Sequence, residues 1–152
     1  MRIWVDADAC PGPVKEIVVR AANRVKVCAV FVANKAINVP ASPYVSTARV
    51  GQGADVADGR IVESASPCDL AVTADIPLAA RLVAKGVAVI DPRGTLFTEE
   101  NVGEALALRD FMHDLREGGV TTPGQGRFGP RETAQFAQSF DRELTRALSR
   151  DS

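Results

Sequence analysis

The stretch RIWVDADACPGPVKEIVVRA at residues 2–21 places a short apolar strand directly before an amphipathic helix. Ile3–Val5 has the length and composition of a buried strand. Pro11 and Pro13 fit the first turn of a helix, where the missing N–H would have no partner in any case. Apolar residues then recur with the spacing of one helix face: Val14, Ile17, Val18 and Ala21. A buried strand that leads into such a helix is typical of α/β proteins.

The alternation of strands and helices continues to about residue 90. We expect further strands at residues 25–32, 46–50, 70–73 and 87–90. The helix before the strand at 70–73 should have one apolar face, formed by Ala54, Ala57, Ile61 and Ala65. The next helix should carry Pro77 in its first turn and end at Gly86 in a left-handed conformation. The pattern predicts an α/β fold in which three layers, α/β/α, surround a mainly parallel sheet of about five strands.

Two C-terminal helices are predicted after Pro92, where the alternation stops. Thr98 is a good N-cap for the first, with Glu99 and Glu100 in its positive first turn. We expect that helix to end at Gly118-Gly119 and to bury four apolar residues, Leu108, Phe111, Met112 and Leu115. The last helix should run through Phe136, Phe140 and Leu144. The length of 152 residues predicts a single domain, residues 1–152, with a sheet core at 1–95 and the helical part at 96–152 packed on it.

The composition excludes several classes of protein. Eighteen Lys and Arg against nineteen Asp and Glu give a formal net charge of -1, so no overall positive field attracts polyanions. The first residues lack a signal-peptide pattern, and no apolar run approaches the roughly 20 residues of a membrane span. We therefore expect a cytoplasmic protein with no membrane partner. Three widely spaced cysteines and the lone His113 argue against a disulfide scaffold and against a Cys/His zinc site.

Aspartates follow the predicted strands at several places. Asp6 ends the first strand, Asp8 lies two residues on, and Asp75 follows the strand at 70–73. Asp55 and Asp58 are spaced to share one face near the start of a helix. Residues that follow parallel strands point into the crevice at the carboxyl ends of the sheet. Because crowded carboxylates repel one another, a hard cation with oxygen ligands, Mg²⁺ or Mn²⁺, would be needed to keep them ionised.

Simpler roles remain open for some of these aspartates. Asp75 before Ile76-Pro77 could equally be a helix N-cap. Asp55 and Asp58 could form a solvated face or a favourable charge at a helix start. Asp6 and Asp8 are harder to explain in this way, because two carboxylates at one strand end cannot both cap the same turn. The recurrence of aspartates at strand ends therefore favours a metal site.

Three residues are candidates for substrate contacts at the same edge of the sheet. Arg93 follows the strand at 87–90, and its guanidinium suits a phosphate. Asn34 and Lys35 follow the strand at 25–32.

Arg142, Arg146 and Arg150 form a positive stripe on the last helix, which could follow a nucleic-acid backbone or simply be a solvated face.

The chain also resembles the YaiI/YqxD family of bacterial proteins, which is grouped by fold with the PIN-like and NYN nucleases. The resemblance covers nearly the whole chain and rests on six motifs: VDADACP at 5–11, VFVAN at 30–34, GADVAD at 53–58, TADIPLA at 73–79, PRG at 92–94 and the helix with Arg109-Asp110. The loop at 121–128 departs from the expected glycine and proline arrangement. By motif position, the resemblance implies a PIN-like fold with Mg²⁺ or Mn²⁺ held by Asp6, Asp58 or Asp55, and Asp75, with Asp8 in addition.

These observations predict a metal-dependent nuclease that hydrolyses phosphodiester bonds in RNA, with Asp6, Asp8, Asp58 and Asp75 as catalytic residues. Such an endoribonuclease would need no serine, cysteine or histidine nucleophile. A non-catalytic RNA-binding or regulatory module stays open as an alternative. A phosphatase of the haloacid dehalogenase type, with Asp6 as nucleophile, is a weaker one because Cys10 breaks the usual Asp-x-Asp-x-Thr/Val motif. The sequence leaves the oligomeric state open.

Overall fold

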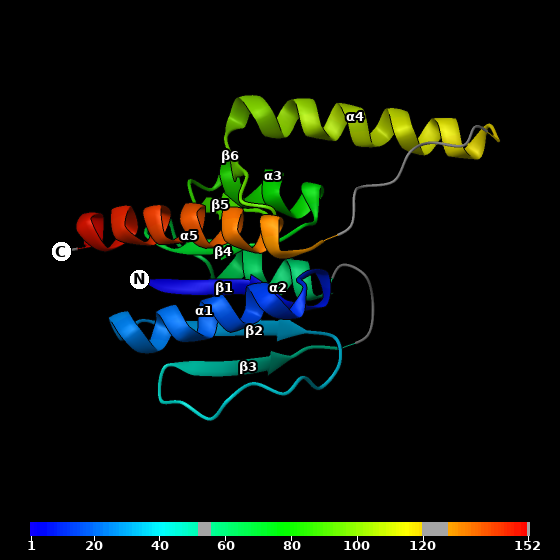
Figure 1. Cartoon of the computed structure of the whole chain (residues 1–152). Coiled ribbons are helices and arrows are strands. Elements are labelled where there is room, and N and C mark those ends of the chain that lie inside the picture. Colours follow the sequence, from blue (N-terminus) through cyan, green and yellow to red (C-terminus); the bar gives the residue numbers. More distant parts are fainter. Residues whose placement is uncertain (52–55, 120–127, 152) are drawn as a thin grey trace.

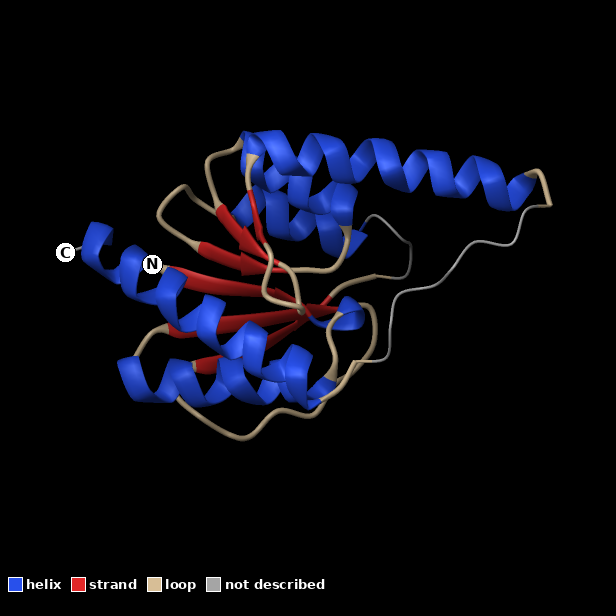
Figure 2. Cartoon of the chain, turned by 45° about the horizontal axis from the view of Figure 1, so that its top comes forward, coloured by secondary structure: helices blue, strands red, loops and turns tan. Residues whose placement is uncertain are grey.

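The computed structural model describes residues 1–51, 56–119 and 128–151. A central sheet lies between two layers of helices, which confirms the predicted α/β fold in three layers (Figures 1 and 2). In chain order, the elements are β1 (Arg2–Asp6), the short 3-10 helix η1 (Ala7–Ala9), α1 (Gly12–Val25), β2 (Cys28–Ala33), β3 (Val45–Arg49), α2 (Val56–Ser64), β4 (Leu70–Val72), α3 (Ile76–Ala84), β5 (Ala88–Ile90), β6 (Leu96–Phe97), α4 (Glu99–Glu117) and α5 (Pro130–Asp151).

The sheet has six strands in the order β3-β2-β1-β4-β5-β6. The first five are parallel, and β6 pairs antiparallel with β5. The order changes direction at β1, because β2 and β3 extend the sheet on one side while β4 and β5 extend it on the other. In such open sheets, ligands bind beyond the carboxyl ends of the strands at this change of direction. The carboxyl ends of β1 and β4 are therefore the place where a site is expected.

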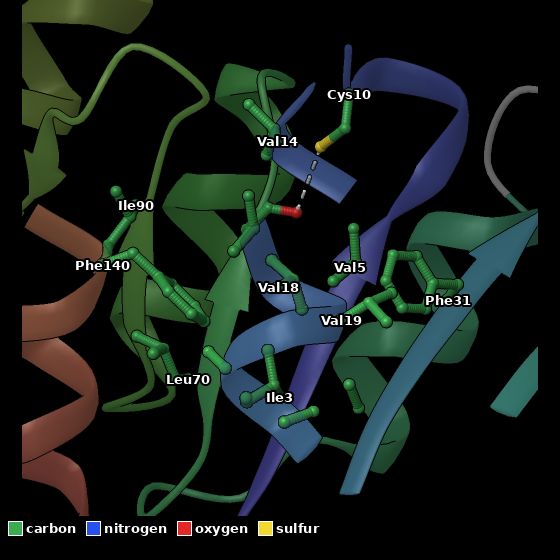
Figure 3. Close-up of a cluster of buried hydrophobic side chains, with 14 of the residues drawn as sticks. Ile3, Val5, Cys10, Val14, Val18, Val19, Phe31, Leu70, Ile90 and Phe140 are labelled. Carbon is green, nitrogen blue, oxygen red and sulfur yellow. Dashed lines mark hydrogen bonds between the residues drawn. The ribbon is translucent and has the colours of Figure 1, made fainter. Parts of the chain in front are cut away.

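Each face of the sheet has its own apolar core. On one face, Val5 and Phe31 of the sheet pack against Val14 and Val18 of α1 and Phe140 of α5 (Figure 3). On the other face, the buried residues include Trp4 and Val89 of the sheet, Ile61 of α2 and Leu82 of α3. In α5, Phe136 and Phe140 stack with their ring centroids 5.3 Å apart. The sheet is thus buried on both faces, as its continuous apolar strands require.

The helix α4 differs from its prediction. Thr98 caps it as expected, through a capping box in which the Thr98 side chain accepts from the Asn101 N–H. However, Leu108 and Phe111 are 56% and 58% exposed, so the prediction that they are buried is wrong. Among its described residues, α4 buries Val102, close to its start, against the α2–α3 face of the sheet. Figures 1 and 2 show why: α4 contacts α3 near its start and then extends beyond the rest of the fold.

Two further details differ from the sequence prediction. The strand expected at 25–32 begins only at Cys28, because α1 continues to Val25 and ends at Lys26, which adopts a left-handed conformation with φ 59°. The two-residue strand β6 was not predicted, since Leu96-Phe97 is too short to produce a periodic pattern.

Gly86 has φ 88°, in agreement with the predicted left-handed helix end. No helix in the described ranges is both long and apolar enough to cross a membrane.

Candidate functional site

Asp6 occupies the central position at the carboxyl edge of the sheet. It ends β1, the strand at which the strand order changes direction, and only 5% of the residue is exposed. The hydroxyl of Thr73, which directly follows β4, donates to Asp6 Oδ2 at 2.8 Å. The same hydroxyl accepts from the Asp75 N–H at 3.0 Å. Thr73 therefore links the aspartates that follow the two neighbouring strands.

The carboxylates around Asp6 are close enough to influence its ionisation. Burial raises the pKa of Asp6, and the negative charges of Asp75 and Asp8 raise it further, while the hydrogen bond from Thr73 lowers it. The net result is a raised pKa, so the ionised form of Asp6 is disfavoured in the folded protein. Like charges that share a site in this way are stabilised by a cation.

Asp75 also caps the helix that follows it. Its Oδ1 accepts from the Leu78 N–H at 3.0 Å, and Pro77 lies in the first turn of α3 as predicted. The helix-capping role that the sequence left open for Asp75 is thus present in the structure. A cap uses one carboxylate oxygen, and the described residues provide no hydrogen bond to the other, Oδ2. Capping and ligand binding can therefore be combined in this residue.

Asp8 lies on η1 and contacts the end of the neighbouring strand β2. Its Oδ2 accepts from the Asn34 N–H at 2.7 Å, while the Asp8 residue as a whole is exposed. The side-chain oxygen Oδ1 of Asn34 is buried and has no hydrogen-bond partner within the described part of the chain. A buried acceptor without a partner is costly, and it is normally satisfied by a ligand, an ion or water. Asn34 thus brings a second unsatisfied oxygen to the edge that holds Asp8.

The remaining predicted ligands are less well placed. Asp58 lies half-buried in the first turn of α2, a helix that contacts both β1 and β2. Asp55 lies outside the described residues, as do 121–127 of the loop before α5. In the described ranges, no three acidic, histidine or cysteine side chains form a ready-made metal cluster. The structure thus places Asp6, Asp8 and Asp75 at the carboxyl ends of β1 and β4 without arranging them as a closed coordination shell.

Cys10 belongs to the core on the side of the sheet covered by α1 and α5, and Asp91 directly follows β5. The thiol of Cys10 is buried and lies 4.0 Å from the carbonyl oxygen of Val72 (Figure 3). Burial raises the pKa of the Cys10 thiol to about 12, with Asp6 adding to the effect, so that the thiol is protonated at neutral pH. Asp91 accepts from the Arg93 N–H at 3.0 Å and the Thr95 N–H at 2.8 Å, which fixes the turn after β5. Both residues serve packing and turn formation.

The three predicted substrate-contact residues have different surroundings. Arg93 is half-buried, with Nη1 3.9 Å from Glu132 and its guanidinium over the Phe128 ring, 5.7 Å from the centroid. The structure therefore attaches Arg93 to the start of α5. Asn34 contacts Asp8 as described above. Lys35 is exposed and lines a cavity of about 220 Å³ at the ends of β2 and β3.

Sequence reasoning did not single out Thr73, although its hydroxyl joins Asp6 to Asp75. A polar residue at the end of an apolar strand, two residues before Asp75, was the signal that could have found it. Arg49 was also missed, and it lines the same cavity as Lys35. The stripe on α5 is partly neutralised, because Arg142 Nε and Arg146 Nη1 lie 3.4 and 3.1 Å from the buried Glu143.

Comparison with known proteins gives a consistent result over the length of the chain. The sequence model of the family described as "Uncharacterized BCR, YaiI/YqxD family" matches residues 4–146. A protein named UPF0178 protein from Myxococcus xanthus is 60% identical over 148 residues, which cover 97% of each chain. Proteins of the same name from Syntrophobacter fumaroxidans and Geobacter metallireducens are 56% and 52% identical, over 96% and 97% of this chain and 95% and 96% of theirs. No solved structure matches the chain significantly.

Proposed function

This chain belongs to the YaiI/YqxD family, and we propose that it is a divalent-metal-dependent nuclease that hydrolyses phosphodiester bonds in RNA. The observation that carries the proposal is that Asp6 ends β1 at the change of strand order, where the Thr73 hydroxyl links it to Asp75 and where Asp8 lies two residues further along the chain. The resemblance to PIN-like nucleases supports the reaction and the choice of RNA.

The proposed ligands at this edge are oxygen atoms, the donor type that a hard cation prefers. Asp6, Asp8 and Asp75 supply carboxylates, and Asn34 Oδ1 is a buried oxygen without a partner. Oxygen-only donors of this kind are the ligands of Mg²⁺ and Mn²⁺. Because the described side chains do not form a closed metal cluster, binding requires a side chain to turn, and the exposed Asp8 has room to do so. Asp58 of α2 is the further candidate ligand.

The metal, when bound, would lower the pKa of a water molecule and neutralise charge that develops on a phosphoryl oxygen. Asp6 would hold the metal at a fixed position, because β1 and the Thr73 hydroxyl hold the Asp6 carboxylate in place. Asp75 is held similarly by its position at the start of α3. Carboxylates that are already held in place cost no reorganisation free energy during the reaction. Such preorganisation lowers the activation barrier of an active site.

The Asp6→Asn substitution tests the proposal. Asn keeps the shape of the side chain and an oxygen that can accept from Thr73, but it removes the charge. With labelled single-stranded RNA and Mn²⁺, we expect cleavage to be at least about 100-fold slower than in the wild type, since even indirect metal contacts are worth 10–100-fold. Mn²⁺ should also raise the thermal unfolding midpoint of the wild type, because a ligand of the native state stabilises it, and should raise that of Asp6→Asn less.

Asp141→Asn provides the matched control, because it removes the same charge from an exposed residue of α5 that pairs with Arg24. We expect the control to cleave RNA and to respond to Mn²⁺ like the wild type. Equal cleavage by the wild type and Asp6→Asn, or no cleavage by either, would show that this edge does not catalyse the reaction.

A further inference from the structure

A small cavity with basic walls lies beside the aspartates, at the ends of β2 and β3. Arg49, the last residue of β3, is the register partner of Ala33, the last residue of β2. The next residue, Asn34, donates to Asp8, and Lys35 follows it. Lys35 lines the cavity and is the next residue after Asn34, and consecutive Cα atoms are about 3.8 Å apart. Lys35, which lines the cavity, is thus the chain neighbour of the residue that contacts Asp8.

The lining of this cavity combines an apolar base with cationic walls. The exposed Ala36 and the partly buried Ile37 contribute apolar atoms, whereas Lys35 and Arg49 contribute the charges. Both charged residues are exposed, and neither side chain has a hydrogen bond or ion pair within the described part of the chain. By contrast, Arg24, Arg142 and Arg146 each lie beside a carboxylate. The two cations beside the cavity are thus available for an anion from outside.

The volume restricts what can enter. At about 220 Å³, the cavity is smaller than the roughly 300 Å³ at which sites for drug-sized ligands begin. A single planar ring system is an occupant of suitable size and polarity, and an attached phosphate would lie near Lys35 and Arg49. Arg and Lys at the end of a strand are common phosphate contacts.

We propose that this cavity is a nucleotide subsite, in which a base of the substrate strand enters between Lys35 and Arg49 while the adjoining phosphate contacts both cations. The proposal rests on the proposed function for its choice of RNA as substrate and deepens it by specifying the substrate class. A base can enter only if it is unstacked and unpaired, so the substrate is single-stranded. The backbone then continues from the cavity past Asn34 towards Asp8 and Asp6.

Binding of a short fluorescein-labelled single-stranded RNA, measured by fluorescence anisotropy in EDTA, tests this subsite without any cleavage. Lys35→Gln and Arg49→Gln should each weaken binding, and the two substitutions together should reduce the slope of log affinity against log salt by about 0.7, the value expected for one phosphate contact on a single strand. Arg81→Gln, on the exposed surface of α3, is the control for an unspecific charge effect and should leave the slope unchanged.

The exposed Ala36 allows the base contact to be tested separately, since Ala36→Trp would fill the cavity without altering charge. The wild type should bind a base-containing strand roughly tenfold more tightly than an abasic strand of equal length, because one base contact is lost in the latter. Ala36→Trp should abolish that preference. A wild type that binds duplex as tightly as single strands, or variants whose affinity and salt slope equal those of the wild type, would overturn the subsite.

Failure of the subsite and failure of the nuclease function give different results. Asp6→Asn should bind RNA in EDTA at least as tightly as the wild type, because losing a carboxylate cannot weaken attraction for a polyanion. If binding depends on Arg49 but no cleavage occurs with Mn²⁺, the subsite stands and the nuclease function fails. If cleavage depends on Asp6 while RNA affinity is unchanged by Lys35→Gln and Arg49→Gln, the nuclease function stands and the subsite fails.

Discussion

Two buried aspartates, Asp6 and Asp69, lie at opposite ends of the strands and have opposite pKa shifts. Burial of Asp69 acts to raise its pKa, but hydrogen bonds from the Ser66 N–H, the Trp4 indole and the Arg2 N–H outweigh burial and lower it. Asp6 receives one hydrogen bond from a side chain and faces two other carboxylates, so its pKa is raised. The hydrogen bonds around Asp69 therefore favour its ionised form, whereas the surroundings of Asp6 disfavour its ionised form.

The lowered pKa of Asp69 predicts a pH-dependent contribution to stability. Because its folded pKa lies below the unfolded value, the ionised carboxylate stabilises the fold above about pH 4, and this contribution is lost as the pH falls through the folded pKa. At pH 7, Asp69→Asn should lower the free energy of unfolding by about 2 kcal/mol, in the range for hydrogen bonds to charged groups. Urea unfolding followed by fluorescence of Trp4, the only tryptophan, measures this.

The difference between wild type and Asp69→Asn should shrink below about pH 4, since the protonated carboxyl then resembles the amide. Asp141→Asn is again a suitable comparison, because its exposed pair with Arg24 is worth at most about 1 kcal/mol. A difference that stays constant from pH 7 to the acid range would contradict the assignment of the stabilisation to the Asp69 charge.

Residue-scale predictions from the sequence were informative wherever a side chain directly follows a strand. Asp6, Asp8 and Asp75 could be placed at one edge from their positions after apolar runs, and in the structure the Thr73 hydroxyl joins Asp6 to Asp75 while Asp8 accepts from the Asn34 N–H. The surroundings of Arg93 could not be predicted in this way. Its partners Glu132 and Phe128 lie in a distant part of the chain, and only the packing of α5 brings them close. Whether these residues act in catalysis stays a prediction.

At the scale of elements, α4 shows the limit of periodicity. Its apolar spacing predicted the helix and Thr98 predicted its start, but spacing cannot say whether another element covers the apolar face. The chain folds so that α3 covers only the beginning of α4, and Leu108 and Phe111 remain exposed. The expected burial failed because it depended on a tertiary neighbour that the sequence pattern does not encode.

A matched pair of substitutions measures this difference between α4 and α5. Phe111→Ala should change the free energy of unfolding by about 0.5 kcal/mol or less, as at other exposed positions. Phe140→Ala removes a side chain that is 1% exposed and stacked on Phe136, so it should cost about 3–5 kcal/mol. Chemical denaturation of both variants checks the prediction, and a cost at Phe111 similar to that at Phe140 would mean that α4 has a covered face in solution.

At the scale of the whole molecule, one glycine allows the turn after β5 to approach α5. Gly94 has φ 95°, and a Cβ built on it would lie 2.7 Å from the carbonyl oxygen of Gln135 in α5. No side chain fits between the two backbones at this point. The position of α5 on the sheet, and with it the contact between Arg93 and Glu132, depends on this close approach.

Gly94→Ala should therefore lower the free energy of unfolding by about 2–4 kcal/mol, because left-handed strain of about 1–2 kcal/mol adds to the displacement of α5. Gly103→Ala makes the same change inside α4, where a Cβ meets nothing within 4 Å, and should stabilise the protein by about 0.5–1 kcal/mol through helix propensity. Thermal unfolding of the two variants gives the comparison. If Gly94→Ala raised the unfolding temperature as Gly103→Ala is expected to do, the close approach of the turn to α5 would carry no strain.

The strand order was beyond the reach of sequence reasoning, and this is the information that places the site. Alternating strands and helices predicted a mainly parallel sheet, but any of several orders would satisfy that pattern. The observed order puts β1 beside β4 at the change of direction, which brings Asp6 next to Thr73 and links it to Asp75. The fold class was therefore predictable from local signals, whereas the neighbours of each aspartate were not.

The position of β3 at the end of the sheet has a consequence for solubility. The strand pairs with β2 on one side, and its outer edge could pair with the same edge of another copy, which is a known route to aggregation. Exposed polar residues, Ser46, Thr47 and Arg49, lie along this strand, and charged or polar side chains are the usual protection of such edges. The guanidinium of Arg49 is therefore expected to keep neighbouring molecules apart as well as to attract a phosphate.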